Sequence, residues 1–158
     1  MRKIKIPNYG IITIKNLLFD INGTLKFQGK IPPDLIKKFK ELKKIYKIYL
    51  ISSDTRGNLK EIAEALDVDY IKIEPQGITE AEAKNNELIK LGKNVSVAVG
   101  NGNNDALMLK NAVLGIVIIG NEGASIKSIM NSDIAFPSPL SVLNFLLDEK
   151  IMIATLRS

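Results

Sequence analysis

The chain contains no cysteine, no histidine and no tryptophan among its 158 residues. Without cysteine it has no disulfide bond, no thiolate metal site and no cysteine nucleophile. Without histidine it lacks the commonest general base and the commonest transition-metal ligand. Any catalysis must therefore depend on Asp, Glu, Lys, Ser, Thr, Tyr or a hard metal ion.

Arginine is also scarce, because only Arg2, Arg56 and Arg157 among the 22 basic residues are arginine. The formal net charge is +5 and the pI is about 9.3. Readers of nucleic acid often use the bidentate fork of Arg, so the lysine excess indicates a solvated surface and disfavours nucleic acid as a partner. No apolar stretch approaches the ~20 residues of a membrane span, and the first residues lack the apolar core of a signal peptide. We therefore expect a cytoplasmic protein without membrane contact.

Hydrophobic residues make up 46% of the chain and charged residues 25%, as in ordinary globular proteins. At this length one domain buries roughly 70% of its unfolded surface, so we expect a single domain over residues 1–158. The hydrophobic pattern predicts a β-hairpin from strands 4–6 and 11–14, then strands at 17–20, 48–51, 70–73, 95–99, 114–119 and 133–136. It predicts helices at 34–46, 58–66, 79–91, 105–111, 124–130 and from about 139 onward.

Strands that alternate with helices form right-handed βαβ units and a mainly parallel sheet covered on both faces. The sequence therefore predicts an α/β fold, a Rossmann-like three-layer sandwich with an N-terminal β-hairpin. In such sheets ligands bind beyond the carboxyl ends of the strands.

Polar residues able to do chemistry gather after the strands of this expected sheet and on one helix. They are Asp20, Asn22, Gly23 and Thr24 after the first strand, Ser52, Ser53 and Asp54 after the second, Gly100, Asn101, Gly102, Asn104 and Asp105 after the fourth, and Lys84 on the preceding helix. Each has a simpler interpretation. The first loop could be an Asx turn. Ser52 could be a helix cap or part of a turn, in which case Ser53 or Thr55 could bind the phosphate instead. Lys84 could be a solvated lysine of the helix surface, with Lys90 and Lys93 as alternative candidates.

Taken together and in this order, the motifs resemble those of the haloacid dehalogenase-like (HAD-like) phosphohydrolases. That family has an Asp-x-Asp-Gly-Thr loop, a strand that ends in Ser or Thr, a lysine, and a Gly-Asp loop with a second Asp. The resemblance covers about residues 11–136. It is strongest to the phosphorylation core of P-type ATPases and to the soluble P-type ATPase-like proteins, whose Thr-Gly-Asp and Gly-Asp-Gly-x-Asn-Asp motifs are similar to residues 52–54 and 100–105.

The resemblance implies a HAD-like fold and a phosphatase or phosphotransferase that works through a phosphoaspartate at Asp20. A carboxylate is ionised at neutral pH and needs no histidine to activate it, but its attack on a phosphate dianion requires a divalent cation. The implied Mg²⁺ ligands are Asp20, the Asn22 main-chain carbonyl, Asn101 and Asp105. The implied phosphate-binding residues are Gly23, Thr24, Ser52, Ser53 and Lys84.

Two residues depart from the family pattern. Asn22 replaces the Asp that acts as general acid/base, which contributes roughly 10²- to 10⁴-fold in such reactions. Asn101 replaces a metal-binding Asp, which removes a negative charge from the cation site. We therefore expect a slow enzyme, and the alternative is a non-catalytic HAD-like module that binds a phosphorylated partner or nucleic acid.

The gaps between motifs predict an open site. The segment from Asp20 to Ser52 holds only a flap (Leu25 to Ile31) and one helix, and the segment from Ser52 to Lys84 has no room for a cap domain. We expect a capless enzyme that acts on a phosphorylated small molecule or macromolecule. A neighbouring subunit of a homo-oligomer, reached by residues 151–158, is one way to close the site.

Overall fold

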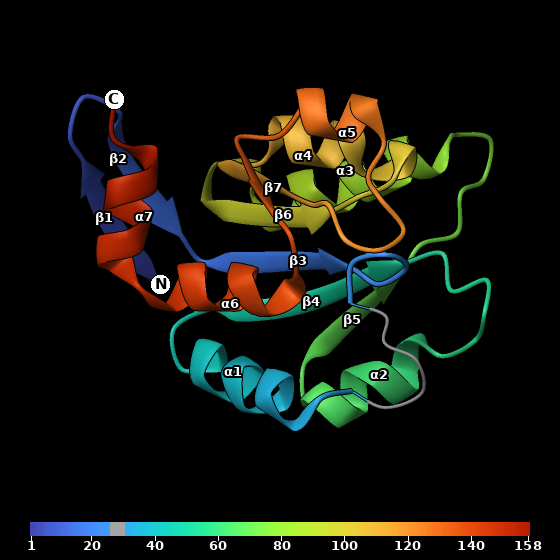
Figure 1. The fold of residues 1–158 in the computed structure, drawn as a ribbon. Helices are drawn as coiled ribbons and strands as arrows, with labels where there is room; N and C mark the ends of the chain where they lie inside the picture. Colours follow the sequence, from blue (N-terminus) through green and yellow to red (C-terminus); the bar gives the residue numbers. More distant parts are fainter. Residues whose placement is uncertain (26–30) are drawn as a thin grey trace.

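The computed structural model describes residues 1–25 and 31–158 of the chain. Within them, six strands form one parallel sheet in the order β5-β4-β3-β6-β7-β8, and two form a separate antiparallel hairpin (Figure 1). The strands are β1 (Arg2–Ile6), β2 (Gly10–Ile14), β3 (Asn16–Asp20), β4 (Lys47–Ser52), β5 (Asp69–Lys72), β6 (Ser96–Gly100), β7 (Leu114–Ile118) and β8 (Ile134–Phe136). The helices are α1 (Pro33–Lys43), α2 (Leu59–Leu66), α3 (Glu80–Leu91), α4 (Ala106–Asn111), α5 (Ile126–Met130), α6 (Pro139–Leu147) and α7 (Glu149–Leu156), with 3₁₀ turns at Lys93–Val95 and Asn103–Asp105.

The order of the strands places a topological switch at the centre of the sheet. From β3 the chain runs outward to β4 and β5, and it then returns to place β6 on the other side of β3. The carboxyl ends of β3 and β6 therefore flank the crevice where open parallel sheets bind ligands. Asp20 ends β3, Ser52 ends β4 and Gly100 ends β6, so the loops singled out by the sequence meet at one edge.

The two faces of the sheet are covered by different helices, which confirms the expected three-layer architecture. Helices α1, α2 and α6 lie on one side and α3, α4 and α5 on the other (Figure 1). Alternation along β3 sends Leu17 and Phe19 into the larger core and Leu18 into the core shared with α3 and α4. Asp20 follows Leu18 by two residues, so the same alternation directs its carboxylate towards the α3 side.

The C-terminal region differs from the expected single helix that begins near residue 139. The helix ends at Leu147, and the side chain of Asp148 accepts hydrogen bonds from the backbone N–H groups of Lys150 and Ile151. Asp148 thus caps a separate helix, α7, whose apolar residues do not signal the break. Helix α7 lies beside the β1–β2 hairpin, where the Asn8 side chain donates to the carbonyl of Ser158 at 2.9 Å (Figure 1).

The predicted flap between Leu25 and Ile31 falls mostly on residues 26–30, which lie outside the described residues. None of the helices in the described parts of the chain combines the length and the apolar character needed to cross a bilayer.

Candidate active site

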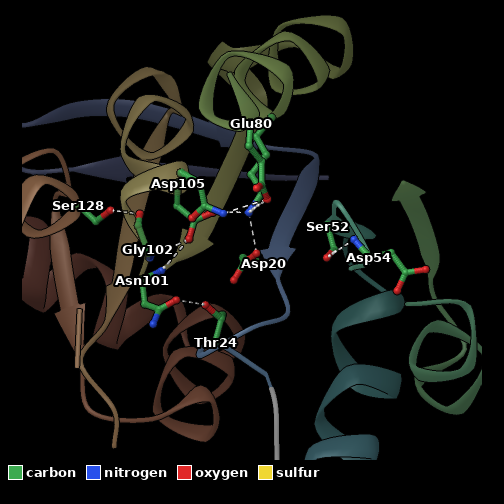
Figure 2. A network of polar contacts seen from close by, with 11 residues as sticks. Asp20, Thr24, Ser52, Asp54, Glu80, Asn101, Gly102, Asp105 and Ser128 are labelled. Atoms are coloured by element: carbon green, nitrogen blue, oxygen red, sulfur yellow. Dashed lines mark hydrogen bonds and ion pairs between the residues drawn. The ribbon is translucent and has the colours of Figure 1, made fainter. Parts of the chain in front are cut away.

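Lys84 is the centre of a buried charge cluster at the carboxyl edge of the sheet. Its ammonium nitrogen lies 2.7 Å from Asp20 Oδ1 and 2.7 Å from Asp105 Oδ1, and its side chain is fully buried (Figure 2). The two carboxylate oxygens are therefore no more than twice this distance apart. Asp105 is also fully buried and Asp20 nearly so. Of the lysines that the sequence offered, the structure brings Lys84 to the two acidic residues, and it places Lys90 in an exposed pair with Glu87.

Lys84 reaches this position because of how α3 begins. Thr79 and Glu82 form a capping box, in which the Thr79 hydroxyl accepts from the Glu82 N–H and the Glu82 carboxylate accepts from the Thr79 N–H. The cap fixes the start of α3, so Lys84 occupies the second turn on the face that packs against the sheet. The interior therefore receives a lysine that a surface helix would normally expose.

The charges in the cluster shift one another's protonation. Burial raises the pKa of Asp20, the negative charge of Asp105 raises it further, and the charge and hydrogen bond of Lys84 lower it, with a net rise to about 7. Burial by itself lowers the pKa of Lys84, but the charges of Asp105 and Asp20 outweigh it and raise this pKa. Lys84 is therefore always protonated. Ionisation of Asp20 is unfavourable at this site, and a further positive charge nearby would lower the pKa of Asp20 and favour its carboxylate.

The loop after β6 is built around the Asp105 carboxylate. Asp105 Oδ2 accepts hydrogen bonds from the backbone N–H groups of Asn101 (3.0 Å) and Gly102 (2.9 Å). A Cβ atom on Gly100 would lie 2.5 Å from Asp105 Cγ, so only glycine fits at this position. Asp105 thus holds both the loop backbone and Lys84, and the Gly100–Asp105 motif forms a rigid unit.

Asn101 connects three loops through its side chain. Its Nδ2 donates to the carbonyl of Gly123 at 3.2 Å, and its Oδ1 accepts from the Thr24 hydroxyl at 3.5 Å (Figure 2). Gly23 has a φ of +76°, and a Cβ there would lie 2.2 Å from Asn101 Nδ2. The Gly23 backbone therefore turns directly against Asn101, which leaves room only for glycine at this position.

Ser52 and Asp54 form a separate part of the site, on the far side of Asp20 from Asn101 (Figure 2). The Ser52 hydroxyl is buried and accepts from the Asp54 N–H at 3.0 Å. Asp54 has a φ of +56°, and its Oδ1 accepts from the N–H of Leu59, the first residue of α2, at 2.9 Å. Asp54 thus serves the start of α2, and Ser53 is partly exposed between the two.

The sequence interpretation missed Ser128, whose hydroxyl donates to the Gly102 carbonyl, and Glu80 (Figure 2). Glu80 accepts a hydrogen bond from Asn104 Nδ2 at 2.9 Å and lies 3.8 Å from the Lys84 ammonium. Its position four residues before Lys84 on the same helix is the signal that could have found it. By contrast, Asn22 is partly exposed, and its side chain has no hydrogen bond to another residue within 1–25 or 31–158.

The available donors suit a hard divalent cation in kind but supply little charge. Among the described residues no group of three or more acidic side chains is arranged to hold a metal. Asp20 and Asp105 supply two carboxylates that meet at Lys84, and Asn101 supplies an amide oxygen on the loop after β6. Carboxylate and amide oxygens are ligands that Mg²⁺ accepts. The residues present therefore fit Mg²⁺, but we expect a lower affinity than at a site with a third carboxylate.

Comparison with known proteins identifies both sequence relatives and structural neighbours. A family model described as haloacid dehalogenase-like hydrolase matches residues 27–112. An uncharacterised protein of Methanocaldococcus jannaschii is 52% identical over 61 residues, which cover 39% of this chain and 66% of that protein. A copper-transporting ATPase of Schizosaccharomyces pombe is 24% identical over 129 residues, which cover 80% of this chain and 14% of the ATPase. The chain thus spans slightly less than two thirds of the first relative and a small part of the second.

Three solved structures illustrate the range of proteins with this fold. A 3-deoxy-D-manno-octulosonate 8-phosphate phosphatase of Moraxella catarrhalis, solved with magnesium, phosphate and the sugar acid, has a TM-score of 0.66 at 16% identity and covers 90% of this chain and 92% of its own. A phospho-aspartyl intermediate analogue of phosphoserine phosphatase has a TM-score of 0.63 at 20% identity, over 84% of this chain and 99% of its own. A zinc-transporting P-type ATPase has a TM-score of 0.61 at 24% identity, over 81% of this chain and 20% of its own.

Proposed function

The chain belongs to the haloacid dehalogenase-like hydrolases, and from this premise we propose that it is a Mg²⁺-dependent phosphatase or phosphotransferase that works through a phosphoaspartate at Asp20. The observation that carries the proposal is the contact of Lys84 with both Asp20 and Asp105 at the topological switch of the sheet. A fully buried lysine between two carboxylates is unfavourable to desolvate. A phosphoryl-transfer site accounts for it, because such a site needs a nucleophile and a fixed positive charge together.

In the proposed reaction a carboxylate oxygen of Asp20 attacks the phosphorus of a phosphomonoester. The new bond between Asp20 and phosphorus forms as the bond from phosphorus to the ester oxygen breaks, and that oxygen leaves with the electron pair. Lys84 remains protonated throughout and stabilises negative charge on the transferred group. The Ser52 or Ser53 hydroxyl and the backbone at Gly23 and Thr24 are proposed to hold the remaining phosphoryl oxygens.

The proposed Mg²⁺ ligands are Asp20, the Asn22 carbonyl, Asn101 and Asp105. The cation would neutralise charge between the nucleophile and the phosphate. Asp105 already holds two backbone N–H groups and Lys84, so the ion depends mainly on Asp20. We therefore propose that Mg²⁺ binds weakly and that activity requires a high concentration of Mg²⁺.

The leaving group and the phosphoaspartate both need a proton-transfer group, and Asn22 cannot serve as one. A slow release of the leaving group and a long-lived phosphoaspartate follow from this. Two of the structural neighbours are phosphatases of a sugar-acid phosphate and of phosphoserine. For this chain we propose a phosphorylated small molecule or an exposed phosphate on a macromolecule, bound in an open, capless site.

Steady-state phosphate release from a panel of phosphorylated metabolites, with Mg²⁺ and with Mn²⁺, tests the proposal. We expect release that requires the cation and is abolished by Asp20→Asn, a nearly isosteric change. Lys90→Ala is the control, because this lysine lies on the exposed face of the same helix. Release that persists in Asp20→Asn would refute the covalent mechanism.

Asn22 and Asn101 also favour a second candidate, a HAD-like module that binds a phosphorylated partner without turnover. Beryllofluoride with Mg²⁺ mimics a phosphoaspartate and separates the two. A working site should gain several degrees in melting temperature on addition of both, and Asp20→Asn should gain none. No shift in the wild type, together with no turnover, would favour the module.

A further inference from the structure

The two asparagines that depart from the family pattern share a second property. Each is followed by glycine, and Asn22-Gly23 and Asn101-Gly102 are the two Asn-Gly pairs in the sequence. Asn-Gly is the pair most prone to spontaneous deamidation, because glycine has no side chain to block the attack of its backbone nitrogen on the asparagine side chain. Both positions therefore carry a latent route from amide to carboxylate.

The structure separates the two pairs by how firmly each is held. The attacking atom at the second pair would be the Gly102 nitrogen, whose N–H donates to Asp105 Oδ2 at 2.9 Å. The Asn101 side chain is buried and donates to Gly123, and the Asn101 carbonyl accepts from the Ser125 N–H at 2.8 Å. A hydrogen-bonded nitrogen and a fixed side chain cannot approach each other without local opening.

The reacting groups of the first pair are held more loosely. Within residues 1–25 and 31–158, neither the Asn22 side chain nor the Gly23 N–H has a hydrogen-bond partner, and both residues are partly exposed. The turn itself is held by the N–H groups of Thr24 and Leu25, which donate to the Ile21 carbonyl at 3.2 and 2.9 Å. Those two bonds join residues that are themselves buried, and they are the barrier to the rotation that the reaction needs.

We propose that Asn22 deamidates spontaneously in the folded protein while Asn101 is protected, and that the aspartate formed at position 22 supplies the missing acid/base group. The second half of this inference rests on the proposed phosphoaspartate chemistry. The Gly23 nitrogen attacks Asn22 Cγ, a five-membered succinimide closes, and the side-chain nitrogen leaves as ammonia. Water then opens the ring at either carbonyl to give aspartate or isoaspartate, so each event consumes one water and releases one ammonia.

The two products have different consequences for the site. Aspartate places a carboxylate two residues after Asp20 without changing the backbone. Isoaspartate adds a backbone atom and misplaces the turn against Asn101, so that product should be inactive. A purified sample would thus contain slow, fast and damaged molecules in proportions that change with age.

Peptide mapping tests the first half without any activity assay. Trypsin releases residues 16–26 and residues 94–110, and incubation in H₂¹⁸O before digestion labels only the events of that incubation. In the folded protein we expect Asn22 to convert about ten-fold faster than Asn101, the protection that a few hydrogen bonds supply. In guanidinium chloride both pairs should convert at similar rates. Equal or slower conversion at Asn22 in the folded protein would overturn the proposal.

The second half is tested by activity on an alkyl phosphate, with chromatography to separate aspartate from isoaspartate at position 22. We expect turnover to rise with the aspartate fraction towards that of a fresh Asn22→Asp sample, while aged Asn22→Gln shows no rise. Conversion to aspartate without a rise would overturn the acid/base assignment. That result would leave the nucleophilic role of Asp20 to be judged by labelling of Asp20 itself.

Discussion

The loop after β6 and the loop after β3 meet at the same edge of the sheet, but they are built in opposite ways. In the first, Asp105 accepts from two backbone N–H groups and from Lys84, and the Gly100 position has no room for a side chain. In the second, Gly23 and Thr24 contact Asn101, but the side chain of Asn22 has no hydrogen-bond partner among residues 1–25 and 31–158. We therefore expect a change at Asp105 or Gly100 to disrupt the fold, and a change at Asn22 to leave the fold in place.

Removal of Lys84 should have the largest effect. Lys84→Met leaves two buried carboxylates without their cation, and breaking a buried pair in this way costs about 3–5 kcal/mol. For a chain of this length we expect the melting temperature to fall by on the order of 10 °C. Thermal unfolding measures it, and Lys90→Met on the exposed face of α3 is the matched control, expected within about 0.5 kcal/mol of the wild type. A small loss for Lys84→Met would contradict a buried ion-pair cluster around this lysine.

Asp20→Asn should raise stability in the absence of Mg²⁺. The folded-state pKa of Asp20 is raised above the ordinary value of 3.8 to about 7, so the folded protein binds an extra proton between these values and loses stability as the pH rises through them. The variant removes this loss, and we expect a gain of about 1–3 kcal/mol at neutral pH. The contact with Lys84 is already included in the net pKa of Asp20. Melting curves at pH 5 and pH 8 should show the gain growing with pH. A gain that is the same at both values would contradict the shifted pKa.

Most of this arrangement could be predicted from the sequence, because it depends on local patterns. The apolar run before Asp20 was enough to place this residue at the carboxyl edge of the sheet, whereas Lys84 was assigned to the same site only by the resemblance to the HAD-like phosphohydrolases. The contact of Asp105 with two N–H groups depends on the path of a loop, and the role of Asp54 at the start of α2 depends on a left-handed backbone at a residue other than glycine. The break at Asp148 was hidden because apolar residues continue on both sides of it.

Asn22→Asp, at a partly exposed position of the site, should increase turnover. We expect hydrolysis of an alkyl phosphate to rise by roughly ten-fold or more, within the range of general acid/base groups. An activated aryl phosphate should gain less, because its leaving group departs without a proton. Steady-state rates on the two substrates measure the difference. Equal gains on both, or none, would show that residue 22 does not protonate the leaving group.

Substitution of Asp54 should have the smallest effect. Asp54→Ala loses the hydrogen bond to the Leu59 N–H. It also places alanine at a positive φ, which alanine adopts less readily than Asp. Together the two effects cost about 1–2 kcal/mol. Asp54→Asn keeps an acceptor oxygen and tolerates this backbone, so it should lie close to the wild type in stability and in turnover. Chemical denaturation of the two variants measures the difference. A large loss of turnover in Asp54→Asn would instead place Asp54 in the chemistry.

The covalent phosphoaspartate at Asp20 is the central claim, and its direct detection is the most decisive measurement. The protein is incubated with acetyl phosphate and Mg²⁺, quenched in acid and reduced with borohydride, which converts a phosphoaspartate to homoserine. Mass spectrometry should then find homoserine at position 20 in the peptide of residues 16–26, only when Mg²⁺ and acetyl phosphate are both present. An unmodified Asp20 under these conditions, in protein that hydrolyses phosphomonoesters, would contradict the mechanism.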